Sequence, residues 1–144
     1  MPRDTGIKGV YRIIDANINR AKEGLRVCEE VLRFIVCDRA LVAGFKECRH
    51  RLEKLSASYR ADPRLLRERE SMGDVGRTIK SGSESRRGGW RDIFAANLQR
   101  VKESVRVLEE FSKLHDRAAA AGFKALRYRI YELEKKALQK RDLR

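Results

Sequence analysis

Apolar residues recur along this chain at alternating steps of four and three positions, which is the spacing of one face of an α-helix. The first such stripe predicts a helix from about Val10 to Cys37. Its members are Ile14, Ile18, Ala21, Leu25, Cys28, Leu32 and Ile35. Residues 1–9 contain a proline and two glycines, so we expect an irregular lead-in there.

A second stripe follows after a short connection. Its members are Leu41, Phe45, Cys48, Leu52, Leu55 and Tyr59. Asp38 stands just before the stripe, and an aspartate there can accept a hydrogen bond from the first turn as an N-cap. Because so short a connection forces two helices to pack antiparallel, residues 10–59 are predicted to form a helical hairpin.

Two further stripes follow between residues 91 and 139. They predict one helix from about Arg91 to Leu114 and another from about Asp116 to Gln139. Their members are Phe94, Leu98, Val101, Val105 and Leu108 in the first, and Ala119, Phe123, Leu126, Ile130 and Leu133 in the second. The chain therefore carries two predicted hairpins.

The two hairpins are copies of each other. ANINRAKEGLRVCEE (16–30) and ANLQRVKESVRVLEE (96–110) are identical at nine of fifteen positions, and AGFKECRHR (43–51) matches AGFKALRYR (121–129). Each hairpin buries its stripes best against the other. We therefore predict an all-α fold: one domain over residues 1–144, a four-helix bundle with approximate internal two-fold symmetry.

The connecting segment, about 60–90, has no second copy. Asp62 and Pro63 predict the start of a short helix, PRLLRERE, and Ser71 to Gly89 is a long central loop without periodicity. A loop of this length is typically functional or disordered. Backbone amides of glycines and the guanidinium groups of arginines are suited to binding phosphate, so this loop is a candidate for closing over a phosphate group. The alternative is that the loop is only a solvated basic linker. The residues concerned are Arg67, Arg69, Gly73, Asp74, Gly76, Arg77, Thr78, Arg86 and Arg87.

The net charge of +13 favours anionic partners such as nucleic acid, acidic membrane or phosphorylated metabolites. In the duplicated stretches bases alternate with acids, so a nucleic-acid interface is disfavoured. The three cysteines lack metal-ligand spacing and indicate a reducing compartment. There is no leader-like start and no apolar run long enough to span a bilayer, which predicts a cytoplasmic protein.

Polar residues flank the first stripe and recur in the second copy. Asn17, Arg20 and Glu23 lie along one flank of the first helix, and their counterparts are Asn97, Arg100 and Glu103. We expect this flank to form a groove in which the arginines bind a phosphorylated compound and Glu23 or Glu103 holds Mg²⁺. The alternative is structural: the asparagines satisfy backbone groups and the Arg/Glu pairs stabilise helix surfaces. Glu29, Glu30, Glu109 and Glu110 are predicted to be solvated.

A second candidate for phosphate binding is the pair Lys46 and Arg49, echoed by Lys124 and Arg127. Basic side chains that merely edge a core are the alternative. The two histidines have no ligand-spaced partners, and the chain contains no P-loop, GxGxxG or GxSxG motif. These motifs alone name no reaction.

Four stretches carry a resemblance to a known family. They are YRIIDANINRAKEGLRVCEEVLRF (11–34), RERESMGDVGRT (67–78), AANLQRVKESVRVLEEFSK (95–113) and GFKALRYRIYELE (122–134). Together they resemble the helical domain at the N-terminus of some bacterial two-domain thiamine-phosphate synthases. That domain is regarded as an alternative hydroxymethylpyrimidine-phosphate kinase, unrelated to the ribokinase-like enzyme. Two departures are Glu70, where the family tends to have aspartate, and Arg77, which intervenes between Gly76 and Thr78.

The resemblance implies an ATP- and Mg²⁺-dependent transfer of a phosphoryl group to the pyrimidine monophosphate. The residues that carry over are Asn17, Arg20, Glu23, Asp74, Asn97, Arg100 and Glu103, and the candidates for holding Mg²⁺ are Glu23, Glu103 and Asp74. Since no synthase barrel follows in this sequence, we expect the chain to act alone or beside a separate synthase. Two alternatives are a non-catalytic partner of that synthase and a basic nucleic-acid binder, and a homo-oligomer that completes the site is left open.

Overall fold

The computed structural model describes residues 2–82 and 84–144, and within these ranges every regular element is helical. The order is α1 (Pro2–Val31), a π-helical turn η1 (Leu32–Val36), α2 (Arg39–Ala61), α3 (Pro63–Arg67), α4 (Trp90–Ser112), α5 (Arg117–Leu138) and a 3-10 turn η2 (Arg141–Leu143). The prediction of an all-α fold is confirmed. The four long helices are those predicted, and α3 is shorter than the predicted PRLLRERE segment.

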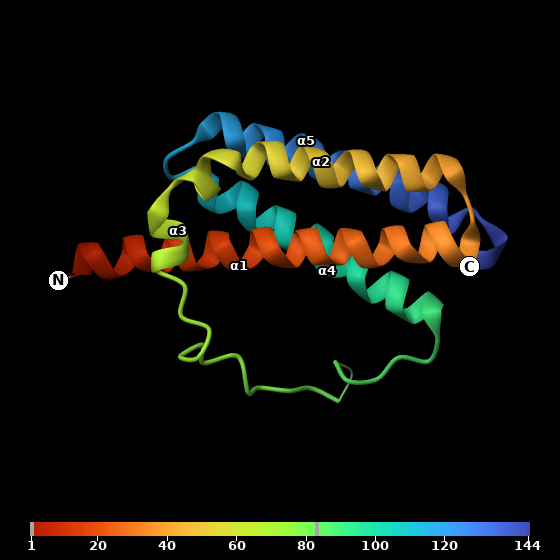
Figure 1. The fold of residues 1–144 in the computed structure, drawn as a ribbon, viewed down its shortest axis with the longest axis horizontal. Helices are drawn as coiled ribbons and strands as arrows, with labels where there is room; N and C mark the ends of the chain where they lie inside the picture. The colour runs from red at the N-terminus through yellow and green to blue at the C-terminus, as the bar shows by residue number, and fades with distance from the viewer. Residues whose placement is uncertain (1, 83) are drawn as a thin grey trace.

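The four long helices pack around one core. α1 packs most extensively on α4, α2 packs on α5, and each helix also contacts its hairpin neighbour (Figure 1). The predicted apolar stripes supply most of this core, including Phe45, Phe94 and Phe123. Ile35 is an exception, treated below.

Small residues let the helices approach each other closely. A methyl group added at Gly44 of α2 would meet Leu133 of α5 at 2.6 Å, and one added at Gly122 of α5 would collide with Leu55 of α2. Gly44 and Gly122 match in the repeat, as do Leu55 and Leu133, so these two contacts are reciprocal. Such reciprocity is what a two-fold relation between the copies requires, and the relation itself stays a prediction.

The N-terminal prediction is wrong, because α1 begins at Pro2 and not near Val10. Gly6 and Gly9 lie inside the helix, with open space around both. Each glycine costs a helix about 1 kcal/mol relative to alanine, whereas extending an existing helix gains one hydrogen bond per residue. Two glycines therefore did not stop the helix. Met1 and Ser83 lie outside the described residues.

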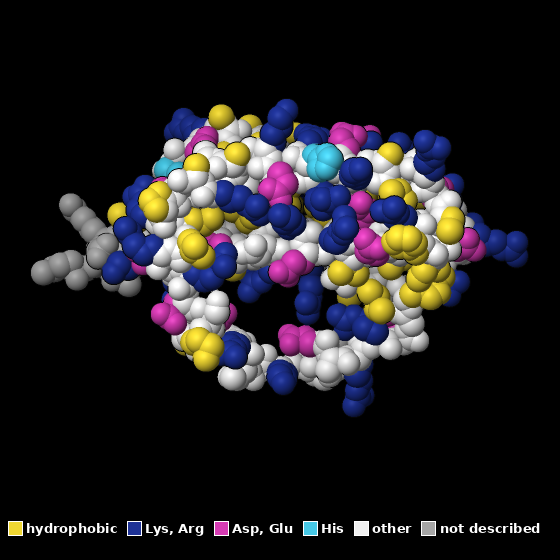
Figure 2. Space-filling view, viewed as in Figure 1, with side chains coloured by type: hydrophobic (Ala, Val, Ile, Leu, Met, Phe, Trp, Pro, Cys, Tyr) yellow, Lys and Arg dark blue, Asp and Glu magenta, His cyan; other side chains and the backbone are white. Residues whose placement is uncertain are grey.

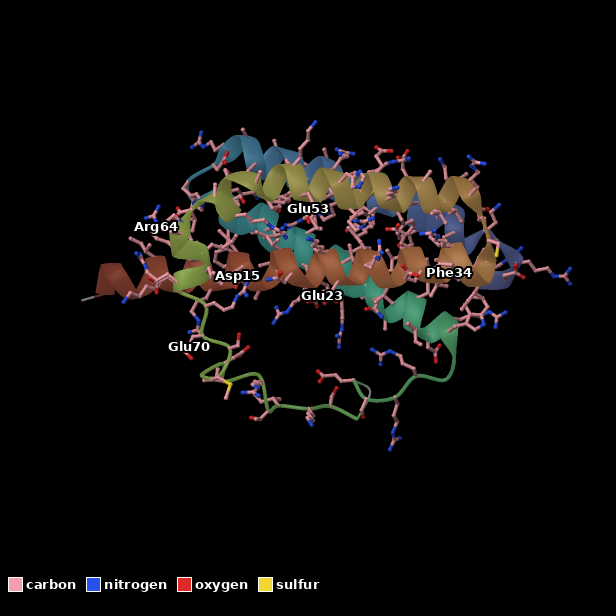
Figure 3. All side chains as sticks on the ribbon, viewed as in Figure 1. Asp15, Glu23, Phe34, Glu53, Arg64 and Glu70 are labelled. Atoms are coloured by element: carbon pink, nitrogen blue, oxygen red, sulfur yellow. The ribbon has the colours of Figure 1, made fainter. Side chains whose placement is uncertain are left out.

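The end of the first helix also differs from the prediction. α1 passes into the π-helical turn η1, which ends at Cys37 with a left-handed φ of 58°. The wider turn rotates the following side chains off the apolar stripe, so Ile35 is 49% exposed and Phe34 is 64% exposed. Apolar side chains gather on the surface at this end of the molecule (Figure 2), where Phe34 is labelled in Figure 3.

Aspartate caps begin three helices. The carboxylates of Asp38 and Asp116, which match in the repeat, accept hydrogen bonds of 2.9 Å from the backbone N–H of Leu41 and Ala119 respectively. Asp62 caps α3 in the same way. The predicted N-caps at Asp38 and Asp62 are confirmed.

Two of the three cysteines behave as small core residues. Cys28 and Cys48 are buried, and burial raises the pKa of the Cys28 thiol to about 12 and that of Cys48 to about 11. Cys37 is exposed. None of the described helices combines the length and the apolar character needed to cross a membrane.

Candidate phosphate-binding groove

The two predicted asparagines both bond to their own helix. Asn17 and Asn97 donate from Nδ2 to the carbonyl oxygens of Ile13 and Ile93, four residues earlier, each at 2.8 Å. Asn17 is buried and Asn97 half-buried. This is the structural alternative given above, in which the asparagine side chains satisfy backbone groups. The hydrogen bond also fixes the orientation of each amide.

Between α1 and α4 lies a groove of about 290 Å³, which we call the inter-copy groove. Four residues of the predicted site line it, namely Asn17, Arg20, Arg100 and Glu103. Ser104 and Val107 complete the lining. The structure therefore brings the flanks of the two copies together. Two predicted members do not line it: Glu23 is exposed on α1, labelled in Figure 3, and Asn97 lies along α4.

Arg20 and Arg100 keep their charges available. Both are exposed, and neither has a carboxylate partner in residues 2–82 or 84–144. Nearby, Glu103 accepts a hydrogen bond of 3.1 Å from Gln99, and Ser104 donates to the carbonyl oxygen of Arg100 at 2.7 Å. Two unpaired guanidinium groups on facing helices are suited to binding one phosphate group.

Close packing of α1 on α4 sets the spacing of this groove. A methyl group added at Gly24 would lie 2.6 Å from Val101 and 3.0 Å from the carbonyl oxygen of Asn97. Only glycine lets the two backbones come this close. Gly24 therefore positions Arg20, one turn earlier on α1, relative to α4.

A second hollow, of about 400 Å³, adjoins the groove where the connecting segment leaves α3. We call it the connecting-segment pocket. Asn17 and Arg20 line it as well as the inter-copy groove. Its other polar lining residues are Arg12, Asp15, Arg69, Glu70, Ser71 and Asp74. Asn17 and Arg20 thus form a wall common to both hollows.

Asp15 ties the connecting segment to α1. Its carboxylate accepts two hydrogen bonds from Arg69, 2.7 Å from Nε and 2.6 Å from Nη2, although its side chain is almost completely buried. Arg12 adds a bond of 3.3 Å to the carbonyl oxygen of Glu70. Figure 3 shows Asp15 and Glu70 close to the point where the segment turns away from the bundle.

The sequence reading missed Asp15, and one signal was available. Directly before the repeated stretch the second copy has Ala95 where the first has Asp15, so the two copies differ there by a charge. A buried charge is costly unless a partner neutralises it. That partner, Arg69, comes from the part of the chain that has no copy.

The central loop is irregular in its described residues, as predicted, and arches away from the helices, leaving an open space between them (Figure 2). Of its predicted phosphate-binding residues, Asp74 lines the connecting-segment pocket. Gly76 is exposed, does not line the pocket, and donates its backbone N–H to Asp74 at 2.8 Å. Gly76 therefore shapes the turn that holds Asp74.

Lys46 and Arg49 lie on α2 and line neither the inter-copy groove nor the connecting-segment pocket; Lys46 is exposed and Arg49 half-buried. Arg49 donates from Nε to Glu29 at 2.9 Å, and Arg127 donates from Nη2 to both carboxylate oxygens of Glu109 at 3.2 Å. The prediction that Glu29 and Glu109 are solvated is wrong, since each is 3% exposed. Both are buried because an arginine of the partner helix neutralises them.

Comparison with known protein families identifies the family to which the chain belongs. The model of the ThiD2 family matches residues 12–136, which is most of the sequence. The chain belongs to the ThiD2 family. The resemblance found in the sequence is thereby confirmed.

This ThiD2 family member is also similar to curated proteins named thiamine-phosphate synthase. It is 43% identical to the one from Synechocystis sp. over 125 residues, 87% of this chain and 35% of the relative. It is 40% identical to that of Nostoc punctiforme (87% and 34%) and 39% identical to that of Rhodopirellula baltica (85% and 32%). The chain thus spans about a third of the length of these relatives. No solved structure matches it.

Few carboxylates that could bind a metal ion line the inter-copy groove and the connecting-segment pocket. No group of three or more Asp, Glu, His or Cys side chains within the described residues is arranged to hold a metal ion. Glu70 and Asp74 both line the connecting-segment pocket, and Glu103 lines the inter-copy groove. One or two carboxylates are what Mg²⁺ takes from a protein when a nucleotide supplies the remaining oxygen ligands.

Proposed function

We propose that this ThiD2 protein acts in thiamine biosynthesis by transferring a phosphoryl group from ATP to hydroxymethylpyrimidine phosphate. The family and the thiamine-phosphate synthase relatives support the pathway. The observation that carries the reaction is the wall shared by two hollows, which puts the unpaired guanidinium of Arg20 at the junction of both. A transfer between two anionic substrates requires adjoining sites with a positive charge between them.

The proposed roles follow from the lining of each hollow. The pyrimidine monophosphate occupies the inter-copy groove, where Arg100 and Arg20 bind its phosphate. The phosphates of ATP occupy the connecting-segment pocket, where Asp74 and Glu70 face Mg²⁺. When bound, Mg²⁺ neutralises charge on the transferring phosphoryl group.

The bond changes balance without an added reactant. A phosphate oxygen of the pyrimidine monophosphate attacks the γ-phosphorus of ATP, and the bond from that phosphorus to the bridging β,γ oxygen breaks. ADP leaves with the electron pair of that bond. The protein contributes position and charge, because a phosphate monoester oxygen is already deprotonated and needs no general base.

Phosphorus NMR tests the proposal directly. Purified chain with Mg·ATP and hydroxymethylpyrimidine phosphate is expected to give ADP and the pyrimidine diphosphate in equal amounts. Omitting the pyrimidine separates this transfer from simple ATP hydrolysis. Turnover no faster than in buffer would contradict the proposal.

A second candidate function, docking on a separate thiamine-phosphate synthase, is favoured by the exposed apolar side chains Phe34 and Ile35. They lie at the end of the molecule where the C-terminus also lies (Figure 1). This candidate predicts that a purified synthase binds the wild-type chain and not the Phe34→Ser variant. Failure of the wild type to bind the synthase at concentrations of tens of micromolar would eliminate it.

A further inference from the structure

A third hollow, of about 610 Å³, lies between α4 and α5 and shares no residue with the inter-copy groove or the connecting-segment pocket. We call it the α4–α5 hollow. Five basic side chains and one carboxylate line it: Arg106, Lys113, Arg117, Lys124, Arg127 and Glu109. The proposed kinase reaction uses none of them.

Two of these basic side chains are unneutralised. Arg127 is bound to Glu109, and Arg106 and Lys113 each reach Glu110, at 3.1 and 2.8 Å. Arg117 and Lys124 are exposed and have no acidic partner anywhere in the described chain. The excess positive charge of the hollow is therefore concentrated on α5.

Helical spacing directs that charge to one place. Arg117, Ala120, Lys124 and Arg127 follow one another at steps of three, four and three, so they share one face of α5. Arg117 and Lys124 are seven residues, or about 10 Å, apart along the helix, and Ala120 between them has only a methyl group. Two long basic side chains can converge over this space on a diphosphate.

Next to these bases lie a buried arginine and an exposed aromatic ring, and the ring indicates a ligand that carries more than phosphate. Arg127 is 8% exposed, and its Nε is buried without a hydrogen-bond partner. Beside it Tyr128 is 56% exposed, lines the hollow, and packs edge-on against Tyr131 with ring centroids 6.0 Å apart. An exposed ring held in place by a second ring is a platform on which a planar group can stack.

We propose that the α4–α5 hollow is a separate binding site for a di- or triphosphate carried on a planar ring. Arg117 and Lys124 bind the phosphates, and Tyr128 stacks on the ring. Glu109 holds Arg127 in the wall between them. The site is distinct from the proposed reaction, so a ligand bound there does not compete with the pyrimidine monophosphate.

The test is calorimetric titration of the full chain with ADP in 0.15 M salt, using Arg20→Ala to weaken the proposed catalytic groove. We expect Arg20→Ala to keep one equivalent of bound ADP. Adding Lys124→Glu should weaken that binding at least tenfold, whereas the matched control Lys136→Glu, an equal charge change at an exposed position of α5, should alter it less than twofold. Unchanged melting temperatures show that the variants fold.

Three outcomes would overturn the proposal. They are equal loss of ADP affinity in the Lys124→Glu and Lys136→Glu variants, no ADP binding once Arg20 is removed, and loss of kinase turnover in the single variant Lys124→Glu. The last would make the hollow part of the reaction site. Tyr128→Ala tests the ring: it should weaken ADP binding several-fold and leave inorganic pyrophosphate unaffected, and an equal effect on both would eliminate the stacking role.

Discussion

Asp15 and Arg69, 54 residues apart, form a two-point ion pair in which the carboxylate is 5% exposed and the guanidinium remains half in solvent. This pair fixes the start of the central loop on α1. It also fixes one wall of the connecting-segment pocket, where both residues are found. The position of Asp74, five residues farther along, depends on this anchor.

Replacing Asp15 by Asn should therefore loosen the loop without unfolding the helices. The amide keeps the size but loses the charge, and we expect a loss of about 1 to 2 kcal/mol in the free energy that holds the segment to α1. Trypsin should cleave the loop at Arg77 or Lys80 several times faster, with unchanged helical circular dichroism. Asp142→Asn, at an exposed carboxylate, is the control. Equal cleavage rates in both variants would show that the pair does not anchor the loop.

The proposed catalytic role of the unpaired arginines in the inter-copy groove can be tested separately from any role in stability. Arg20→Ala and Arg100→Ala should each lower kinase turnover at least about 100-fold, because each removes a positive charge that binds the phosphate of the attacking pyrimidine monophosphate. Since both side chains are exposed and unpaired in the described structure, melting temperatures should change by less than about 2 °C. Lys135→Ala should leave both unchanged. Unfolding of both arginine variants would instead favour a structural role for this flank.

Replacing a buried glutamate should reduce the free energy of unfolding far more than replacing its exposed neighbour. Glu109→Ala leaves the guanidinium of Arg127 buried without its partner and should reduce the free energy of unfolding by about 3 kcal/mol. Glu110→Ala removes only surface ion pairs, which solvent screens, and should change it far less. Urea denaturation of the two variants measures the difference. Similar values would mean that the buried pair contributes nothing beyond a surface pair.

The Asp38 cap makes stability depend on pH. A hydrogen bond from Lys140 and one from the N–H of Leu41 lower the pKa of Asp38 below its ordinary value. Folding therefore favours the ionised carboxylate of Asp38. The stability that this carboxylate contributes is fully present above its unfolded pKa of about 4, and it is lost as the pH falls through the lower pKa of the folded state. Wild type should exceed Asp38→Asn in melting temperature by a constant amount from pH 5 to 7. The difference should shrink below pH 4, and a difference that persists at pH 2 would contradict this assignment.

Much of the fold follows from local sequence signals. Stripe spacing and aspartate caps depend on residues within a few positions, so the four long helices and the caps at Asp38 and Asp62 were predictable. The internal repeat then predicted that Arg20 and Arg100 would face one groove, where both are found. That these residues bind phosphate stays a prediction.

What local signals missed depends on partners far along the chain. The sequence pattern predicted a solvated Glu29, yet its carboxylate is buried and paired with Arg49 of the next helix. Asp15 was overlooked because its partner lies in a segment without periodicity. The π-helical turn at the end of α1 has no sequence pattern of its own, and it displaced Ile35 from the stripe.

The mismatch of Asp15 with Ala95 makes the two copies chemically unequal. A dimer of identical hairpins would carry the aspartate at both positions or at neither, and its groove would have interchangeable ends. When both copies lie in one chain, each can differ in sequence, and here only the first copy has an aspartate that anchors the intervening segment. Because Asp15 lines the connecting-segment pocket and Ala95 lines neither that pocket nor the inter-copy groove, the two copies contribute unequally to the proposed site.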